Sequence, residues 1–177
     1  PHNLGEVVEG LELLMDEPDC TIEDLMGKIK GPDFPTGGII MGKAGIRAAY
    51  NTGRGKITLR SRVEFEKVRG RDAIIVTEIP YMVNKARLVE SIAQLAKEKR
   101  VEGIAHIQDE SSREGMRIVI ELKKDANAEI VLNKLYSYTQ LQDTVGVIML
   151  ALVNGEPKIL SIKQMLEHYL DFQIEVI

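Results

Sequence analysis

Tryptophan is absent from this 177-residue chain, and only 5% of its residues are aromatic. Proteins hold single-stranded nucleic acid largely by stacking bases on aromatic rings, so this scarcity argues against a single-strand binder. The lone cysteine, Cys20, excludes a disulfide framework and a thiolate metal cluster, and it is typical of a protein from the reducing cytoplasm. No run approaches the roughly 20 apolar residues that span a bilayer, so we expect a cytoplasmic protein with no membrane partner.

The residues that usually carry catalysis are equally sparse. The three histidines, His2, His106 and His168, lie far apart in the sequence, without the spacing of metal ligands. No G-x-S-x-G nucleophile motif is present, and Cys20 lacks a local signature of a reactive thiol. We therefore predict no catalytic residue and no metal ligand in this chain.

One segment, Gly37–Lys43, has the spacing of a phosphate-binding loop, which would make the chain a nucleotide-hydrolysing enzyme. Its chemistry argues against that function, because Ala44 stands where a hydroxyl should hold Mg²⁺. The interior of the segment, Ile39–Met41, is also apolar. A short buried strand that ends in a glycine turn is the better interpretation.

The net charge of −4 argues against a nucleic-acid binder until its distribution is considered. Between Arg54 and Asp72 lie seven basic and three acidic residues, so this segment carries +4 while the remainder carries −8. From Lys56 to Glu66 apolar residues alternate with polar ones, which predicts one strand with a buried face and a basic face. Local patches of this kind, rather than net charge, decide where a polyanion binds.

Evenly spaced cations on a rigid strand suit the phosphate backbone of duplex DNA. Gly53 and Gly55 flank Arg54 and would let backbone amides approach a phosphate. A helix that begins after Asn84 would place two more cations beside its N-terminal amides. The predicted DNA contacts are Arg54, Lys56, Arg60, Arg62, Lys85 and Arg87. A merely solvated strand face, partly neutralised by its own glutamates, fits the same residues equally well.

Helical and extended patterns alternate along the chain, and the strands form hairpins rather than βαβ units. Helix-capping residues predict where the longer helices begin, at Asn3, Thr21, Asn84, Asp125 and Ser161. The expected helices are 4–15, 22–29, 44–50, 85–99, 126–137 and 162–176, and the expected strands are 39–41, 56–66, 73–79, 104–108, 116–122, 145–153 and 157–160. We predict the α+β class, a mostly antiparallel sheet with helices packed on it, ending in the start of a long helix.

Seven segments, in order, resemble the A subunits of bacterial type IIA topoisomerases, with DNA gyrase first and topoisomerase IV second. They are PHNLGEV, GPDFPTGG, GIRAAYNTGRGK, EIPYMVNKARL, KEKRVEGI, DESSREGMRIVIELKKDA and NKLYSYTQLQ. The resemblance places residues 1–160 in the family's tower-like DNA-binding domain and residues 161–177 at the start of its long coiled-coil helix. Since the chain has no initiator Met and its last helix lacks a C-terminal cap, we expect an excised fragment.

The resemblance implies an enzyme that cleaves both strands of a gate duplex through tyrosyl-phosphate links, passes another duplex through and reseals the break. None of the five tyrosines matches the motif of the catalytic one, so the fragment is expected to be inactive alone and monomeric. ATP and the catalytic Mg²⁺ are expected on the gyrase B subunit, which completes a heterotetramer with two copies of the A subunit. During ATP-dependent supercoiling the tower would bind an arm of the gate duplex, with His2 and Asn3 nearest to the cleavage centre. A structural spacer with little DNA contact is the alternative.

Overall fold

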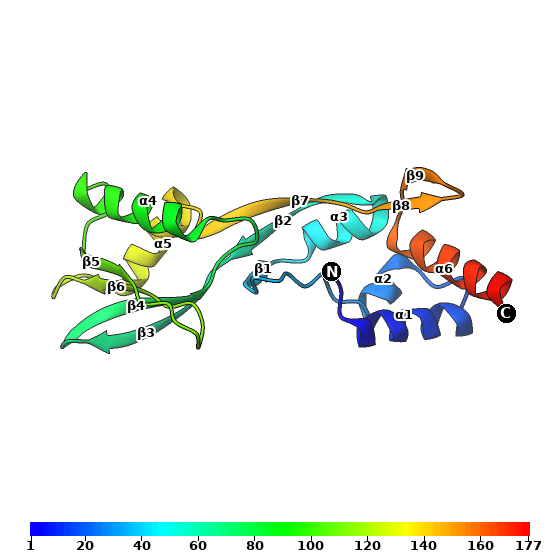
Figure 1. Ribbon diagram of the computed structural model, residues 1–177, viewed down its shortest axis with the longest axis horizontal. Coiled ribbons are helices and arrows are strands. Elements are labelled where there is room, and N and C mark those ends of the chain that lie inside the picture. Colours follow the sequence, from blue (N-terminus) through cyan, green and yellow to red (C-terminus); the bar gives the residue numbers. More distant parts are fainter. The chain divides into compact units, whose positions relative to one another are not determined.

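The computed structural model describes all 177 residues and separates them into two compact units (Figure 1). Unit 1 comprises Pro1–Phe34, Gly42–Thr58 and Thr144–Ile177, and unit 2 comprises Pro35–Met41 and Leu59–Asp143. Two strands, β2 (Arg54–Arg60) and β7 (Gln142–Ile148), each begin in one unit and end in the other. With β1 (Ile39–Met41) they form a three-stranded sheet in the order β1–β2–β7.

Unit 1 is mainly helical. Its helices are α1 (Leu4–Asp16), α2 (Ile22–Met26), α3 (Ala44–Thr52) and α6 (Ile162–Val176), and its hairpin consists of β8 (Leu150–Val153) and β9 (Glu156–Ile159). The predicted caps are confirmed, since the side chains of Asn3, Thr21 and Ser161 accept hydrogen bonds from the first turns of α1, α2 and α6. α6 packs against α1, α2 and α3, which gives this unit its core.

The packing of α3 on β2 depends on two glycines. A Cβ at Gly45 would overlap the carbonyl oxygen of Lys56, and a Cβ at Gly55 would lie 2.6 Å from the carbonyl oxygen of Gly45. The backbone of α3 can therefore contact the backbone of β2 directly only because neither residue has a side chain. As Gly55 faces α3, its neighbours Arg54 and Lys56 must point to the other face of β2.

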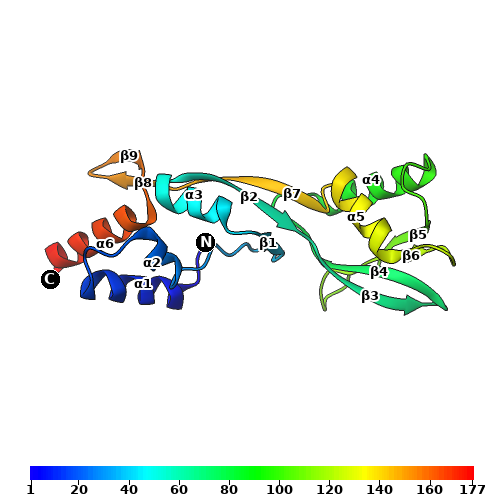
Figure 2. The same ribbon diagram turned by 180° about the vertical axis from the view of Figure 1, so that it is seen from behind.

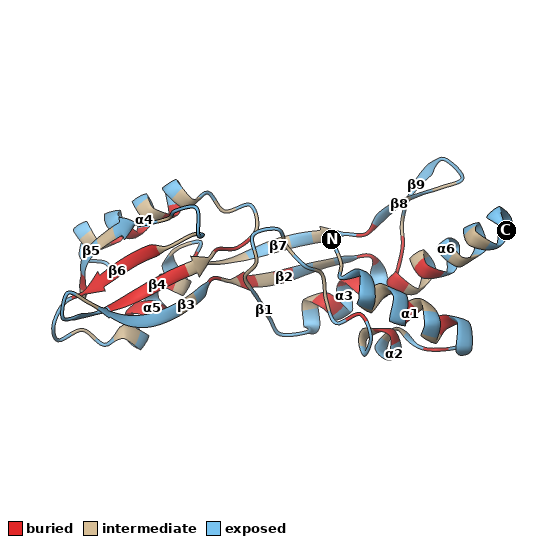
Figure 3. Cartoon of the chain, turned by 60° about the horizontal axis from the view of Figure 1, so that its bottom comes forward, coloured by how far each residue is buried: buried red, intermediate tan, exposed pale blue.

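Unit 2 is built on a four-stranded antiparallel sheet in the order β3–β4–β6–β5. Its elements are β3 (Arg62–Val68), β4 (Arg71–Glu78), β5 (Ile104–Asp109), β6 (Ile118–Leu122), α4 (Lys85–Lys97) and α5 (Ala128–Tyr138). Figure 2 shows both helices on the same side of the sheet, and the burial in Figure 3 is concentrated in β4 and β6. Leu88, Ile92 and Leu95 of α4 are buried as predicted, in one apolar core with β4, β6 and α5.

The predicted α+β class with antiparallel pairing is confirmed, and so are both hairpin turns. Arg69 and Gly70, with φ of 54° and 78°, join β3 to β4, and Asn154 and Gly155, with φ of 53° and 82°, join β8 to β9. Positive φ at both central residues is the geometry that matches the twist of the flanking strands. No helix of the chain is long and apolar enough to cross a membrane. The domain boundary at residue 160 stays a prediction.

Some local predictions are wrong. The strand predicted over 56–66 breaks at Ser61, and the one over 145–153 breaks at Met149, so each is two strands in different sheets. β1 is exposed at both ends rather than buried. Asn127, not Asp125, caps α5, because its side chain accepts from the backbone N–H groups of Glu129 and Ile130.

Candidate nucleic-acid interface

The eight residues predicted to contact DNA divide equally between the two units. His2, Asn3, Arg54 and Lys56 belong to unit 1, and Arg60, Arg62, Lys85 and Arg87 belong to unit 2. The structure therefore does not gather them on one strand face. Their surroundings also differ, and those surroundings decide which of them offers an uncompensated positive charge.

Arg54 and Lys56 are exposed on β2, and neither side chain makes a hydrogen bond or an ion pair. They are two residues apart on one strand, so they lie on the same face, away from α3. Gly53, with φ of 83°, turns the chain from α3 into β2 and so fixes where this pair begins. The result is two free cations on a backbone held in place by close helix packing.

Arg60 is held by neutral partners. Its Nε and Nη2 donate to Gln142 Oε1 at 2.9 and 2.7 Å, and its guanidinium lies 4.2 Å from the centroid of the Tyr136 ring. Burial raises the pKa of Tyr136, so that ring stays uncharged at neutral pH. No ion pair with a carboxylate forms at Arg60, so its charge is uncompensated even though its position is fixed.

Arg62 and Lys85, in contrast, are paired with acids. Arg62 Nε donates to Glu78 Oε2 at 3.1 Å, and the same carboxylate oxygen accepts from the backbone N–H of Gly38 at 2.8 Å. Lys85 Nζ lies 2.9 Å from Asp109 Oδ2. Hydrogen bonds from Ser111, and then the contact with Lys85, lower the pKa of Asp109 to about 2, so this pair is ionised at neutral pH.

Arg87 lies in the first turn of α4 and its side chain has no partner. Its backbone N–H is already used, because it donates to the Asn84 side chain at 3.1 Å. The first turn of α4 contains no acidic residue. Arg87 thus offers an exposed charge, while the cap occupies one of the amides that an anion would need.

His2 and Asn3 have structural contacts inside unit 1. His2 Nε2 lies 2.9 Å from the phenolic oxygen of Tyr50, and burial lowers the pKa of His2, so it is neutral at neutral pH. The Asn3 side chain accepts from the backbone N–H of Glu6 at 3.1 Å and begins α1. Neither side chain is free in the way that Arg54 and Lys56 are.

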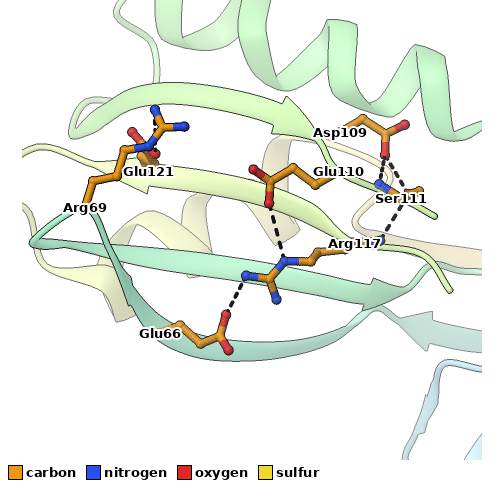
Figure 4. Close-up of polar contacts among 7 residues, drawn as sticks. All are labelled: Glu66, Arg69, Asp109, Glu110, Ser111, Arg117 and Glu121. Atoms are coloured by element: carbon orange, nitrogen blue, oxygen red, sulfur yellow. Dashed lines mark hydrogen bonds and ion pairs between the residues drawn. The ribbon is translucent and has the colours of Figure 1, made fainter. Parts of the chain in front are cut away.

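One face of the unit 2 sheet is not covered by α4 and α5, and it carries a network of arginines and glutamates. Arg117 lies between Glu66 and Glu110, at 2.9 and 3.5 Å, and Arg69 lies 3.8 Å from Glu121 (Figure 4). These ion pairs lie beside a small buried cluster of Ala73, Ile75 and Val119. Since Arg69 and Arg117 are already paired with carboxylates, neither is free to bind a phosphate.

The segment with phosphate-loop spacing, Gly37–Lys43, is built differently from such a loop. Its strand, β1, lies inside the segment instead of before it. The N–H of Gly38 donates to the carboxylate of Glu78, so an amide that should cradle a phosphate faces an acid. This geometry, together with Ala44, argues against the nucleotide-hydrolysing alternative. The chain also contains no group of three or more His, Cys, Asp or Glu side chains that could hold a metal ion.

The sequence analysis did not identify the side chains that contact these cations and so distinguish paired from unpaired ones. Gln142 and Tyr136 reach Arg60 from about 80 residues further along the chain, and Glu78 reaches Arg62 from the neighbouring strand. The Arg62–Glu78 pairing could have been anticipated from the hairpin register, in which Arg62 lies opposite Glu78. No local signal points to the contacts of Arg60.

The structure defines an α+β chain with unpaired cations on a strand that packs closely against a helix. Comparison with known proteins is more specific. Over residues 1–177 the chain matches the family of the A subunits of DNA gyrase and topoisomerase IV, and it belongs to that family. The resemblance inferred from the sequence is thereby confirmed.

Three individual relatives are DNA gyrase A proteins. The chain is 64% identical over 178 residues to the gyrase A protein of Clostridium acetobutylicum, covering 100% of this chain and 21% of that protein. It is 55% identical to the gyrase A protein of Halalkalibacterium halodurans, covering 100% of this chain and 21% of that protein, and 57% identical to that of Rickettsia bellii, covering 100% and 20%. The chain therefore spans about a fifth of the length of these relatives.

Proposed function

We propose that this chain is a DNA-gripping part of the breakage-reunion subunit of a bacterial type IIA topoisomerase, DNA gyrase. In that role it binds an arm of the gate duplex during ATP-dependent supercoiling. Relatives that are 64% and 55% identical to it are gyrase A proteins. The structural observation that carries the proposal is the pair of free, exposed cations, Arg54 and Lys56, on a strand whose backbone α3 holds in place.

Four cations carry the proposed contact, Arg54, Lys56, Arg60 and Arg87, because no carboxylate pairs with them. Arg62 and Lys85 contribute less, since their acid partners must first be displaced. His2 and Asn3 act by holding the backbone at the start of the chain. Neutralising phosphates releases counterions, and that free energy helps to offset a DNA-bending cost on the order of 1–6 kcal/mol.

The chemistry of strand cleavage belongs to other parts of the assembly in this proposal. Tyr50 is 2% exposed, and burial raises its pKa far above the ordinary value, so it is not a ready nucleophile. The chain offers no set of ligands for Mg²⁺. The proposed protein partners are a second gyrase A protein and the gyrase B protein, which holds ATP and Mg²⁺. The complex acts in the cytoplasm, and the chain by itself is a monomer.

Fluorescence anisotropy of a labelled duplex of roughly 30 base pairs, titrated with the chain at several salt concentrations, tests the proposal. The slope of log K against log salt should have a magnitude of about 3 to 6, because each neutralised phosphate contributes about 0.9. Absence of binding at low salt would instead favour a structural spacer that positions the cleavage domain without gripping DNA.

A further inference from the structure

Four lysines outside the predicted set line one groove of unit 2. Lys99 lies just beyond the last turn of α4, Lys123 and Lys124 lie between β6 and α5, and Lys134 lies on α5. The groove has a volume of about 820 Å³. All four side chains are exposed, and they come from three separate segments that the fold of unit 2 brings together.

None of these lysines takes part in an ion pair. Two acids, Glu102 and Asp125, also line the groove, but neither pairs with a lysine, so the lining carries a net charge of about +2. The left-handed backbone of Lys99, with φ of 58°, directs the chain from the end of α4 into the groove wall. The Arg117 network differs, because its arginines are paired with carboxylates.

The arrangement suits an extended polyanion better than a small anion. A phosphate ion needs donors that converge on one point, whereas these lysines come from three separate segments that line the groove. The Asn127 side chain already satisfies the first amides of α5, so that helix end does not supply a converging site. Along α5, Asn127 and Lys134 are roughly 10 Å apart, a distance over which one DNA strand presents about three phosphates.

We propose that this lysine groove is a second contact for the phosphate backbone of duplex DNA, an inference that rests on the proposed function. Arg87 lies in the first turn of α4 and Lys99 lies two residues beyond its last turn. About 18 Å of helix therefore separates them, which corresponds to about five base pairs. A duplex arm that contacts both residues must extend along unit 2. The groove therefore determines the length of duplex that the chain contacts.

The test compares two neutralising double variants in the duplex titration described above. Lys123→Gln with Lys134→Gln removes two groove charges, and Lys28→Gln with Lys30→Gln removes two exposed charges from unit 1 as the matched control. The groove variant should lower the magnitude of the salt slope by about 1.8 and raise Kd at 0.1 M salt by roughly tenfold or more. The control should leave the slope within about 0.5 of the wild-type value. Circular dichroism should be unchanged for both, because all four lysines are exposed.

The outcomes separate this inference from the function on which it rests. If the groove variant and the control give the same slope while Arg54→Gln with Lys56→Gln lowers it, only the groove contact is overturned. If the wild-type chain does not bind the duplex at all, both ideas are overturned. A lower slope in the groove variant alone supports the groove and removes Arg54 and Lys56 from the contact.

Discussion

The guanidinium of Arg60 stacks on the ring of Tyr136 at 4.2 Å, and it also donates twice to Gln142. The three residues come from the end of β2, from α5 and from the start of β7, all within unit 2. Arg60 therefore helps to hold these elements together while it remains an uncompensated cation. A cation fixed in this way loses little further conformational entropy when it meets a phosphate.

Removal of the Arg60 side chain tests its structural role. Arg60→Gln should lower the free energy of unfolding by about 1–2 kcal/mol, because it loses a cation–π contact and two hydrogen bonds. Urea unfolding followed by circular dichroism measures the change. Arg54→Gln is the control, and its unpartnered side chain should contribute less than about 0.5 kcal/mol. Equal midpoints for the two variants would show that Arg60 is not a structural contact.

Glu78 holds Arg62 in an ion pair, so its neutralisation should release a cation. Glu78→Gln keeps an acceptor for the Gly38 N–H but removes the charge opposite Arg62. DNA affinity should rise, and the magnitude of the salt slope should grow by about 0.9, measured by anisotropy. Glu64→Gln removes the same charge from an exposed residue with no ion pair, so a similar gain there would mean that Arg62 does not reach DNA.

A substitution at Gly45 tests whether the backbone of α3 contacts the backbone of β2 directly. On an isolated helix Gly→Ala would stabilise by about 1 kcal/mol. Here the added Cβ overlaps the Lys56 carbonyl, so Gly45→Ala should instead destabilise by about 1–3 kcal/mol and weaken DNA binding through Arg54 and Lys56. Gly146→Ala, where nothing lies within 4 Å of the new Cβ, should be nearly neutral in chemical denaturation. A stabilised Gly45→Ala variant would contradict the close packing.

Asp109 makes stability depend on pH in a defined window. Ser111 and Lys85 lower its folded-state pKa to about 2 from 3.8, so the ionised form stabilises the fold above about pH 4. That contribution should disappear as the pH falls from about 4 to about 2. The difference in unfolding midpoint between wild type and Asp109→Asn should shrink over this range. A difference that stays constant down to pH 2 would show that the carboxylate is not held by these partners.

The strand pattern around Ser61 shows what sequence can and cannot predict. Apolar residues recur at every second position from Ile57 to Phe65, with Ser61 as the one exception, so one long strand is the natural prediction. Ser61 nevertheless donates its N–H to the carbonyl of Leu141 and is 1% exposed, and this long-range contact ends β2 and starts β3. Burial still alternates across the break, so the polar side chain of Ser61 at an otherwise apolar position is the only local sign of it.

Local chemistry, by comparison, was predictable. Asn3, Thr21, Asn84 and Ser161 cap their helices because one side chain and the next three residues decide the geometry. The cap of α5 was predicted wrongly because two suitable residues, Asp125 and Asn127, lie only two positions apart. Whether the charge of each cation is compensated depends on partners such as Gln142 and Asp109 that only the fold brings near, so the sequence identified candidate cations without showing which of them are paired with acids.

Unpaired cations, rather than paired ones, bind the duplex in the proposed function, and one matched comparison tests this most directly. Arg54→Gln with Lys56→Gln and Arg62→Gln with Lys85→Gln each remove two positive charges from the chain. In the anisotropy titration the first pair should reduce the magnitude of the salt slope by about 1.8, and the second by less than half as much. Equal reductions, or a larger one for the paired cations, would contradict the account.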